Sequence, residues 1–286
     1  MAGIGAMGDL ARVNTNVGAT NAYNHLKSKN KAIQQHQEHL ATGQRVNRAS
    51  DSPANYVISR KMQSKANSLA SAQENIGDAM AAMQEADTAL SQIDDIILDM
   101  KSLAQQAASD TVGGAERKAI EYEIQQYASE ITDIAEDTNW QGNSLLDGDL
   151  DWTFQVGEKT EDTIKFSLSS SKDENKGFSA ADLDLTDLKS ANAEEATATW
   201  EKLNKASENI LETEEVIGAV INRMDLKSEA LSSAETNTQA AISRIRDADI
   251  AQEQMSLAKE NILQQISLVM LGQSGQAPGA FMTLFR

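Results

Sequence analysis

Apolar residues recur at alternating steps of four and three between positions 58 and 104, and this run most constrains the fold. It follows Asp51-Ser52-Pro53, where Ser or Asp can cap exposed amides and proline suits the first helical turn. The run predicts one long helix over residues 53–107 that buries a coiled-coil seam. At about 1.5 Å per residue, such a helix spans roughly 80 Å, which no compact globule needs. The seam positions are Ile58, Met62, Lys65, Leu69, Ala72, Ile76, Ala79, Met83, Ala86, Leu90, Ile93, Ile97, Met100 and Ala104.

Two later segments show the same spacing. A turn over Ser109–Ala115 precedes a second predicted helix with Ile120, Ile124 and Ile131 on one face. A third seam extends from Ile217 to Val269 and predicts a rod that runs back past the first two. The fold class is therefore mainly α, with elongated antiparallel coiled-coil rods. The core seam is expected to contain Ile58, Leu69, Ile76, Met83, Leu90, Ile93, Ile97, Ile217, Met224, Leu231 and Ile245.

A small β region interrupts the helices. Apolar and polar residues alternate over 152–156 and over 163–168, and Gly157 to Asp162 separate the two stretches. This pattern predicts a β-hairpin. The following residues, Ser169 to Gly177, are expected to form a polar loop.

The two ends of the chain predict helices that need partners. A front helix over about 17–41 has apolar residues on one face, but Lys29 and His36 interrupt that face and Gly43 ends the helix. Near the other end, apolar residues from Ile262 onward surround the helix, so a protein partner is expected to cover them. We expect four domains: residues 1–45, 46–186, 187–247 and 248–286.

Composition excludes several classes of function. The chain has 25 Lys and Arg against 43 Asp and Glu, a net charge of −18, which argues against nucleic-acid binding. It has no Cys, so disulfides and thiolate metal sites are excluded. No stretch of 18 apolar residues and no basic segment followed by an apolar core occurs, so we expect neither a membrane span nor a cleaved signal.

No catalytic or cofactor site is expected. His36 and His39 have the i, i+3 spacing that can place two imidazoles on one helix face, but Gln37 and Glu38 do not complete H-E-x-x-H. We therefore expect solvated or intersubunit histidines rather than a metal site. The pairs Asp94-Asp95, Glu194-Glu195 and Glu214-Glu215 are interpreted as solvated faces, because adjacent helical positions point apart. The chain is expected not to be an enzyme.

Motifs at both ends resemble those of bacterial flagellins, in the order and spacing of that family. The N-terminal matches are Asn14-Thr-Asn16, Leu40-Ala-Thr-Gly-Gln-Arg-Val-Asn47, Ala49-Ser-Asp-Ser-Pro-Ala54, Gln105-Gln-Ala107, Glu123-Ile124 and Thr138-Asn-Trp-Gln-Gly142. The C-terminal matches are Ala241-Ile-Ser-Arg-Ile-Arg-Asp-Ala-Asp249, Ile262-Leu-Gln-Gln265, Met270-Leu-Gly-Gln273 and Leu284-Phe-Arg286.

The resemblance implies a secreted structural subunit that polymerises into the extracellular flagellar filament, with paired terminal helices as its inner wall. Only about 30 residues separate Leu168 from Trp200, so this is a short form that lacks the outer variable domains of many flagellins. Intersubunit packing is expected at Leu26, Ile33, Leu40, Ile262, Ile266, Val269, Leu271 and Leu284.

The resemblance also implies partners: further copies of the chain, a flagellar export chaperone, and hook-associated and cap proteins. Animal innate immune receptors recognise many flagellins at positions that are here Asp99, Leu103 and Glu123. Responsive relatives carry arginine where this chain has Asp99, so recognition is expected to be weak. Two alternatives remain open: a hook–filament junction protein, and a secreted acidic coiled-coil binding module.

Overall fold

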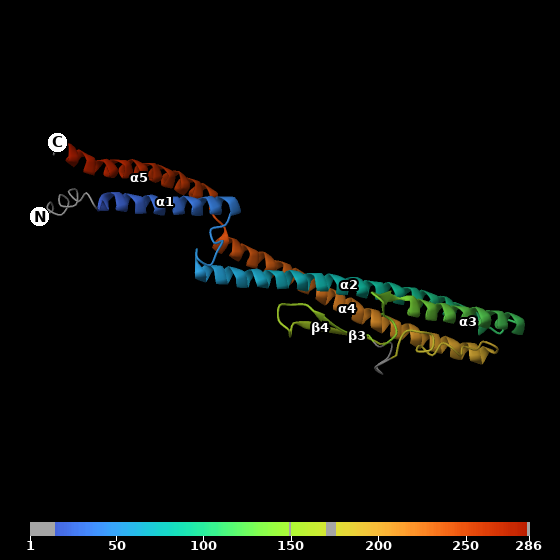
Figure 1. Cartoon of the computed structure of the whole chain (residues 1–286). Coiled ribbons are helices and arrows are strands. Elements are labelled where there is room, and N and C mark those ends of the chain that lie inside the picture. Colours follow the sequence, from blue (N-terminus) through green and yellow to red (C-terminus); the bar gives the residue numbers. More distant parts are fainter. Residues whose placement is uncertain (1–14, 149, 170–175, 285–286) are drawn as a thin grey trace. The chain divides into compact units, whose positions relative to one another are not determined.

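The computed structural model describes residues 15–148, 150–169 and 176–284, with side chains as far as Gln276. The described residues are mainly helical, as the sequence predicts. The helices are α1 (Val17–Thr42), α2 (Pro53–Ala107), α3 (Gly114–Asp137), α4 (Ala193–Arg246) and α5 (Ile250–Leu284). The strands are β1 (Asn139–Trp140), β2 (Asn143–Ser144), β3 (Leu150–Gln155) and β4 (Thr163–Leu168) (Figure 1). None of the described helices has an apolar stretch that could cross a membrane.

The chain divides into two compact units. Residues 1–64 and 238–286 form the terminal unit, and residues 65–237 form the central unit. The boundaries at 64/65 and 237/238 fall inside helices α2 and α4, so both helices contribute to both units. The four domains expected from the sequence, residues 1–45, 46–186, 187–247 and 248–286, remain a prediction.

One apolar core extends through the central unit. The seam of α2 supplies Leu69, Ile76, Met83, Leu90, Ile93 and Ile97, all buried, and α4 supplies Ile217, Met224 and Leu231. Helix α3 adds Ile120, Ile124 and Ile131 to the same cluster. The predicted helix over 53–107 is confirmed at both ends.

The predicted hairpin is also confirmed. Strands β3 and β4 pair antiparallel, with Trp152 opposite Phe166 and Phe154 opposite Ile164. The turn is closed by Val156, whose amide donates to the carbonyl of Asp162 at 2.9 Å. Strand β3 begins at Leu150, two residues before the predicted start, because Leu150 pairs with Leu168 and is buried.

The segment after the hairpin packs into the core without a regular element. Phe178 is fully buried, and its amide donates to the carbonyl of Leu146 at 2.8 Å. Gly148, at φ +84°, makes this approach possible, since a Cβ there would collide with the backbone of Lys176 and Gly177. The predicted polar loop falls largely on residues 170–175, which lie outside the described residues.

Three expectations from the seams are wrong or incomplete. Ile58 is 42% exposed and belongs to the terminal unit, so it is not part of the core. Ile245 is only half-buried. The third seam is not one rod, because the chain leaves helical geometry between Arg246 and Ile250.

The carboxylate of Asp51 does not cap α2. It accepts the backbone N–H groups of Asn47 at 3.0 Å and Arg48 at 2.9 Å, upstream of the helix. The amides of Arg48 and Asn47 hold the pKa of Asp51 below its ordinary range, although burial acts in the opposite direction. Asp51 therefore shapes the loop between α1 and α2.

Replacing Ile93 with Asp is expected to destabilise the central unit severely. Ile93 is fully buried in the core, and an unpaired buried carboxylate costs several kcal/mol. Circular dichroism should show a midpoint lower by about 10 °C or more, because each kcal/mol shifts it by roughly 2–4 °C at this size. Leu98→Asp on the same helix is the control, since Leu98 is 48% exposed. Equal shifts for the two variants would contradict the observed register of α2.

Carboxylates of α2 lie close to the carboxylate of Glu214 on α4. Burial raises the pKa of Glu214, and the carboxylates of Asp87, Asp94 and Asp95 raise it further. Asp94 also accepts a hydrogen bond from Ser207 of α4 at 2.8 Å. Asp94 and Glu214 are half-buried, whereas the adjacent Asp95 and Glu215 are exposed. In these two pairs, the expectation of solvated carboxylates is therefore correct for Asp95 and Glu215 only.

Replacing Glu214 with Gln should stabilise the central unit at neutral pH, because it removes a charge that its neighbours repel. A rise in the thermal midpoint of about 1–3 °C is expected at pH 7. The gain should shrink as the pH falls, since a carboxyl with a raised folded-state pKa destabilises only while it is ionised. Glu215→Gln, at the exposed adjacent position, is the matched control and should leave the midpoint nearly unchanged.

Candidate assembly surface of the terminal helices

Helices α1 and α5 pack antiparallel in the terminal unit (Figure 1). Near one end of the pair, Asn16 donates from its side chain to the carbonyl of Ser274 at 2.6 Å. Further along, Gln264 donates to the side-chain oxygen of Asn30 at 2.6 Å. Asn16 also caps α1 by accepting the amide of Ala19 at 2.9 Å, and Gly43 ends α1 in the left-handed region at φ 68°. The predicted bounds of the front helix are thus confirmed.

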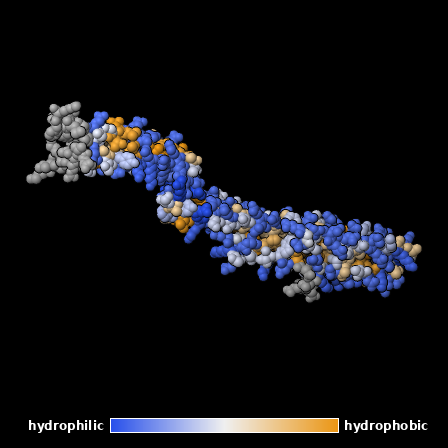
Figure 2. Space-filling model, in the orientation of Figure 1, coloured by the Kyte–Doolittle hydropathy of each residue, from blue (hydrophilic) through white to orange (hydrophobic). Residues whose placement is uncertain are grey.

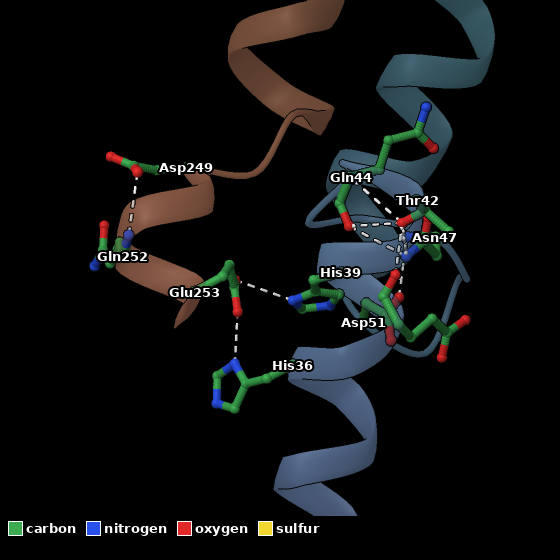
Figure 3. A network of polar contacts seen from close by, with 10 residues as sticks. His36, His39, Thr42, Gln44, Asn47, Asp51, Asp249, Gln252 and Glu253 are labelled. Atoms are coloured by element: carbon green, nitrogen blue, oxygen red, sulfur yellow. Dashed lines mark hydrogen bonds and ion pairs between the residues drawn. The ribbon is translucent and has the colours of Figure 1, made fainter. Parts of the chain in front are cut away.

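The two residues that interrupt the apolar face of α1 have carboxylate partners on α5. Lys29 lies 3.1 Å from Glu260 in an ion pair. His36 lies with its Nδ1 2.5 Å from one carboxylate oxygen of Glu253, and His39 with its Nδ1 3.0 Å from the other (Figure 3). The expectation of solvated or intersubunit histidines is therefore wrong for His36 and His39, which are paired within the subunit.

Sequence reasoning missed Glu253 and Glu260, although a signal was present. Lys29 and His36 are seven residues apart, and so are Glu253 and Glu260. Seven residues are about two helical turns, so antiparallel helices can match both pairs at once. The partners are more than 200 positions apart in the chain, which hides the match from any local pattern.

The environment of Glu253 favours its ionised form. Partial burial alone would raise the pKa of Glu253, but hydrogen bonds from His36 and His39 outweigh burial and hold the pKa below its ordinary value. Glu253 also lies in the first turn of α5, where the helix dipole favours negative charge.

A backbone junction connects the two terminal segments beside this cluster. The amide of Arg45 donates to the carbonyl of Arg246 at 2.7 Å, and the amide of Ala248 donates to the carbonyl of Gly43 at 2.9 Å. Asp249 then caps α5 by accepting the amides of Ala251 at 2.9 Å and Gln252 at 3.1 Å (Figure 3). These contacts explain why α4 and α5 are separate helices. An Asp followed three residues later by Gln is a capping signal that the sequence already contained.

Helix α5 leaves a stripe of apolar side chains in solvent. At about 100° per residue, the members of this stripe lie within an arc of about 100°, on the opposite side from Glu253, Glu260 and Gln264, which contact α1. Figure 2 shows hydrophobic residues gathered on the surface over α5. We call this set the apolar stripe; its members, each 46–68% exposed, are Met255, Ile262, Ile266, Val269 and Met270.

The predicted intersubunit residues fall into two groups. Ile33 is buried within the subunit, and Leu26, Leu40 and Leu271 are half-buried. Ile262, Ile266 and Val269 are exposed. The side chain of Leu284 lies outside the described part of the chain.

The predicted receptor positions lie in the central unit. Asp99 on α2 and Glu123 on α3 are exposed. Leu103 is partly buried against the core.

The described residues thus contain long helices that bury an apolar core in the central unit and a helix, α5, that leaves apolar residues exposed in the terminal unit. Residues 13–151 match the family model of the bacterial flagellin N-terminal helical region, and residues 200–285 match that of the C-terminal helical region. The chain belongs to the flagellin family. It is a subunit of the extracellular bacterial flagellar filament.

Relatives match over nearly the full chain. The flagellin of Halalkalibacterium halodurans is 34% identical over 275 residues, covering 96% of this chain and 99% of the relative. The flagellin of Bacillus subtilis is 31% identical over 306 residues, covering 96% and 100%.

A solved structure described as a flagellar hook-associated protein from Vibrio parahaemolyticus has a TM-score of 0.58 at 15% identity. The match covers 69% of this chain and 100% of the Vibrio parahaemolyticus chain. This likeness shows a shared fold and does not favour the hook–filament junction alternative.

Acid is expected to loosen the α1–α5 pair through Glu253. A carboxyl with a lowered folded-state pKa stabilises the folded state above the unfolded pKa of about 4.3, and this contribution is lost as the pH falls through the folded pKa. Hydrogen exchange of α1 and α5, corrected for intrinsic rates, should therefore increase below about pH 4. Glu253→Gln should remove this part of the acid response. An equal response in both proteins would show that another group is responsible.

Proposed function

We propose that the subunit polymerises through the apolar stripe of α5, while contacts with α1 hold that stripe in position. In this proposal the α1–α5 pair forms the inner part of the filament, as the sequence resemblance implies. The segments 1–45 and 248–286 then act as the inner-core domain, and the segments 46–186 and 187–247 act as the surrounding layer.

The support for this proposal is the mismatch between the two sides of α5. On the side toward α1, Glu253, Glu260 and Gln264 make polar contacts. The opposite side exposes the five residues of the apolar stripe. Burial of apolar surface contributes a favourable free energy of about 25 cal/mol per Å². Contact between the apolar stripe of one copy and another copy of the chain therefore stabilises the assembled state.

The polar contacts between α1 and α5 determine which way the apolar stripe faces. They contribute little to the free energy of assembly. The ion pair of Lys29 and Glu260 is partly exposed, and pairs of this kind contribute about 0–1 kcal/mol. They nevertheless favour one register of α1 against α5. Of the expected intersubunit residues, Ile262, Ile266 and Val269 then contact neighbours directly, and Leu26, Ile33, Leu40 and Leu271 act by supporting the pair.

Further partners follow from the family resemblance and belong to the same proposal. A flagellar export chaperone covers the apolar stripe before assembly, and hook-associated and cap proteins contact the subunits at the ends of the filament. An animal innate immune receptor binds weakly at Asp99, Leu103 and Glu123, because the exposed Asp99 reverses the charge of responsive relatives.

Replacing Val269 with Glu tests the apolar stripe. Val269 is 63% exposed, so the variant subunit should keep its helical content, but a charge in the assembled interface should block polymerisation. Filament yield is measured by sedimentation and electron microscopy after nucleation with filament fragments. We expect at least a tenfold loss of sedimented protein.

Gln265→Glu is the matched control, because it adds the same charge at an exposed position outside the apolar stripe on the same helix. This variant should polymerise nearly normally. Normal filaments from Val269→Glu would overturn the proposal, and loss of filaments from both variants would assign the effect to charge rather than to apolar burial.

A further inference from the structure

The terminal unit contains a cluster of three side chains with the ligand types of a transition-metal site. His36 and His39 come from α1 and Glu253 comes from α5, and their ligand atoms all lie within 4.8 Å of one another. Figure 3 shows both imidazole rings directed at the Glu253 carboxylate. The two histidines lie one helical turn apart, a spacing that places them on the same face.

We propose that His36, His39 and Glu253 bind a divalent transition-metal ion of the zinc type, coordinated by Nδ1 of each histidine and by the carboxylate. Imidazole nitrogen and carboxylate oxygen are zinc ligands at about 2.0–2.2 Å. Ligand atoms around a tetrahedral ion then lie about 3.3 Å apart. The Nδ1 atoms of His36 and His39 lie 2.5 and 3.0 Å from the two different oxygens of Glu253, and the three ligand atoms lie within 4.8 Å of one another. On metal binding the two hydrogen-bonded pairs must therefore lengthen by several tenths of an ångström, and the most widely separated pair must approach by up to about 1.5 Å.

Metal binding at Nδ1 changes which ring nitrogen of each histidine carries a proton. A neutral imidazole that donates Nδ1–H to the carboxylate transfers that proton to Nε2 when Nδ1 binds the metal, whereas an imidazolium releases its Nδ1 proton to solvent and keeps the proton on Nε2. Nε2 of His39 is buried and has no hydrogen-bond partner among the described residues, so this nitrogen lacks a protein partner in either tautomer.

The surroundings leave the three ligands available and give the ion a way in. The side chain of His36 is 24% exposed, whereas those of His39 and Glu253 are 7% and 13% exposed. The nearby carboxylate of Asp51 is engaged by the amides of Asn47 and Arg48, so it does not compete. Three protein ligands leave a fourth position for water or for a group from another molecule.

Metal binding would connect α1 to α5 next to the backbone junction at Gly43 and Ala248. Because the ligands come from both ends of the chain, the ion would restrict the separation of the two helices. Metal binding at these three residues does not depend on the role of the apolar stripe, and it can be measured separately on subunits and on filaments.

Zinc binding to the full chain is measured by equilibrium dialysis with Zn²⁺ alone, for the soluble subunit and for polymerised filaments. We expect one Zn²⁺ per chain in at least one of the two forms. His36→Gln and Glu253→Gln should each weaken binding at least tenfold, and His25→Gln is the matched control because His25 is exposed on the same helix. Co²⁺ in place of Zn²⁺ should give the visible absorption of a tetrahedral nitrogen–oxygen site.

Binding that is lost in His36→Gln and in Glu253→Gln but kept in His25→Gln supports the site. Absence of stoichiometric binding in both subunits and filaments overturns it, and so does binding that His36→Gln leaves unchanged. Circular dichroism of each variant confirms that helical content is retained, and His36 is the preferred position because it is the most exposed of the three ligands.

Discussion

Burial of the apolar seam of α2 is the interaction on which the rest of the structure depends. An isolated helix of 55 residues with one apolar face exposes that face to water along its whole length. In the central unit, α3, α4, the hairpin and the segment around Phe178 all contribute to the single core that covers it. Each of these elements is stabilised mainly by its contact with the seam rather than by its own intrinsic propensity.

The terminal unit lacks an apolar core as extensive as that of the central unit among the described residues. Its two helices meet through ion pairs and amide hydrogen bonds, and few of the described side chains there are buried. Such contacts add little stability in water, but they form together only in the register that places Lys29 opposite Glu260 and His36 opposite Glu253. A helix pair of this kind can be specific in its alignment and still leave apolar surface free for other copies of the chain.

Much of the fold could be predicted because its signals are local. Pro53 and the four-three spacing located α2, Gly43 ended α1, and alternation located the hairpin. The errors arose where a local pattern continued past a change in tertiary context. Ile58 keeps the spacing of the seam but lies in the other unit, and the pattern from Ile217 to Val269 continues through a link where the chain is not helical.

The sequence alone determined the helices, the hairpin and the membership of the flagellin family, because spacing, capping residues and motifs are properties of neighbouring positions. Only the tertiary structure decided that Glu253 joins His36 and His39 and that Glu260 meets Lys29. It also decided that the apolar stripe lies opposite α1. The reason is that the free energy of a polar or ionic contact depends on which distant groups approach within a few ångströms, and that distance is set by the packing of whole helices.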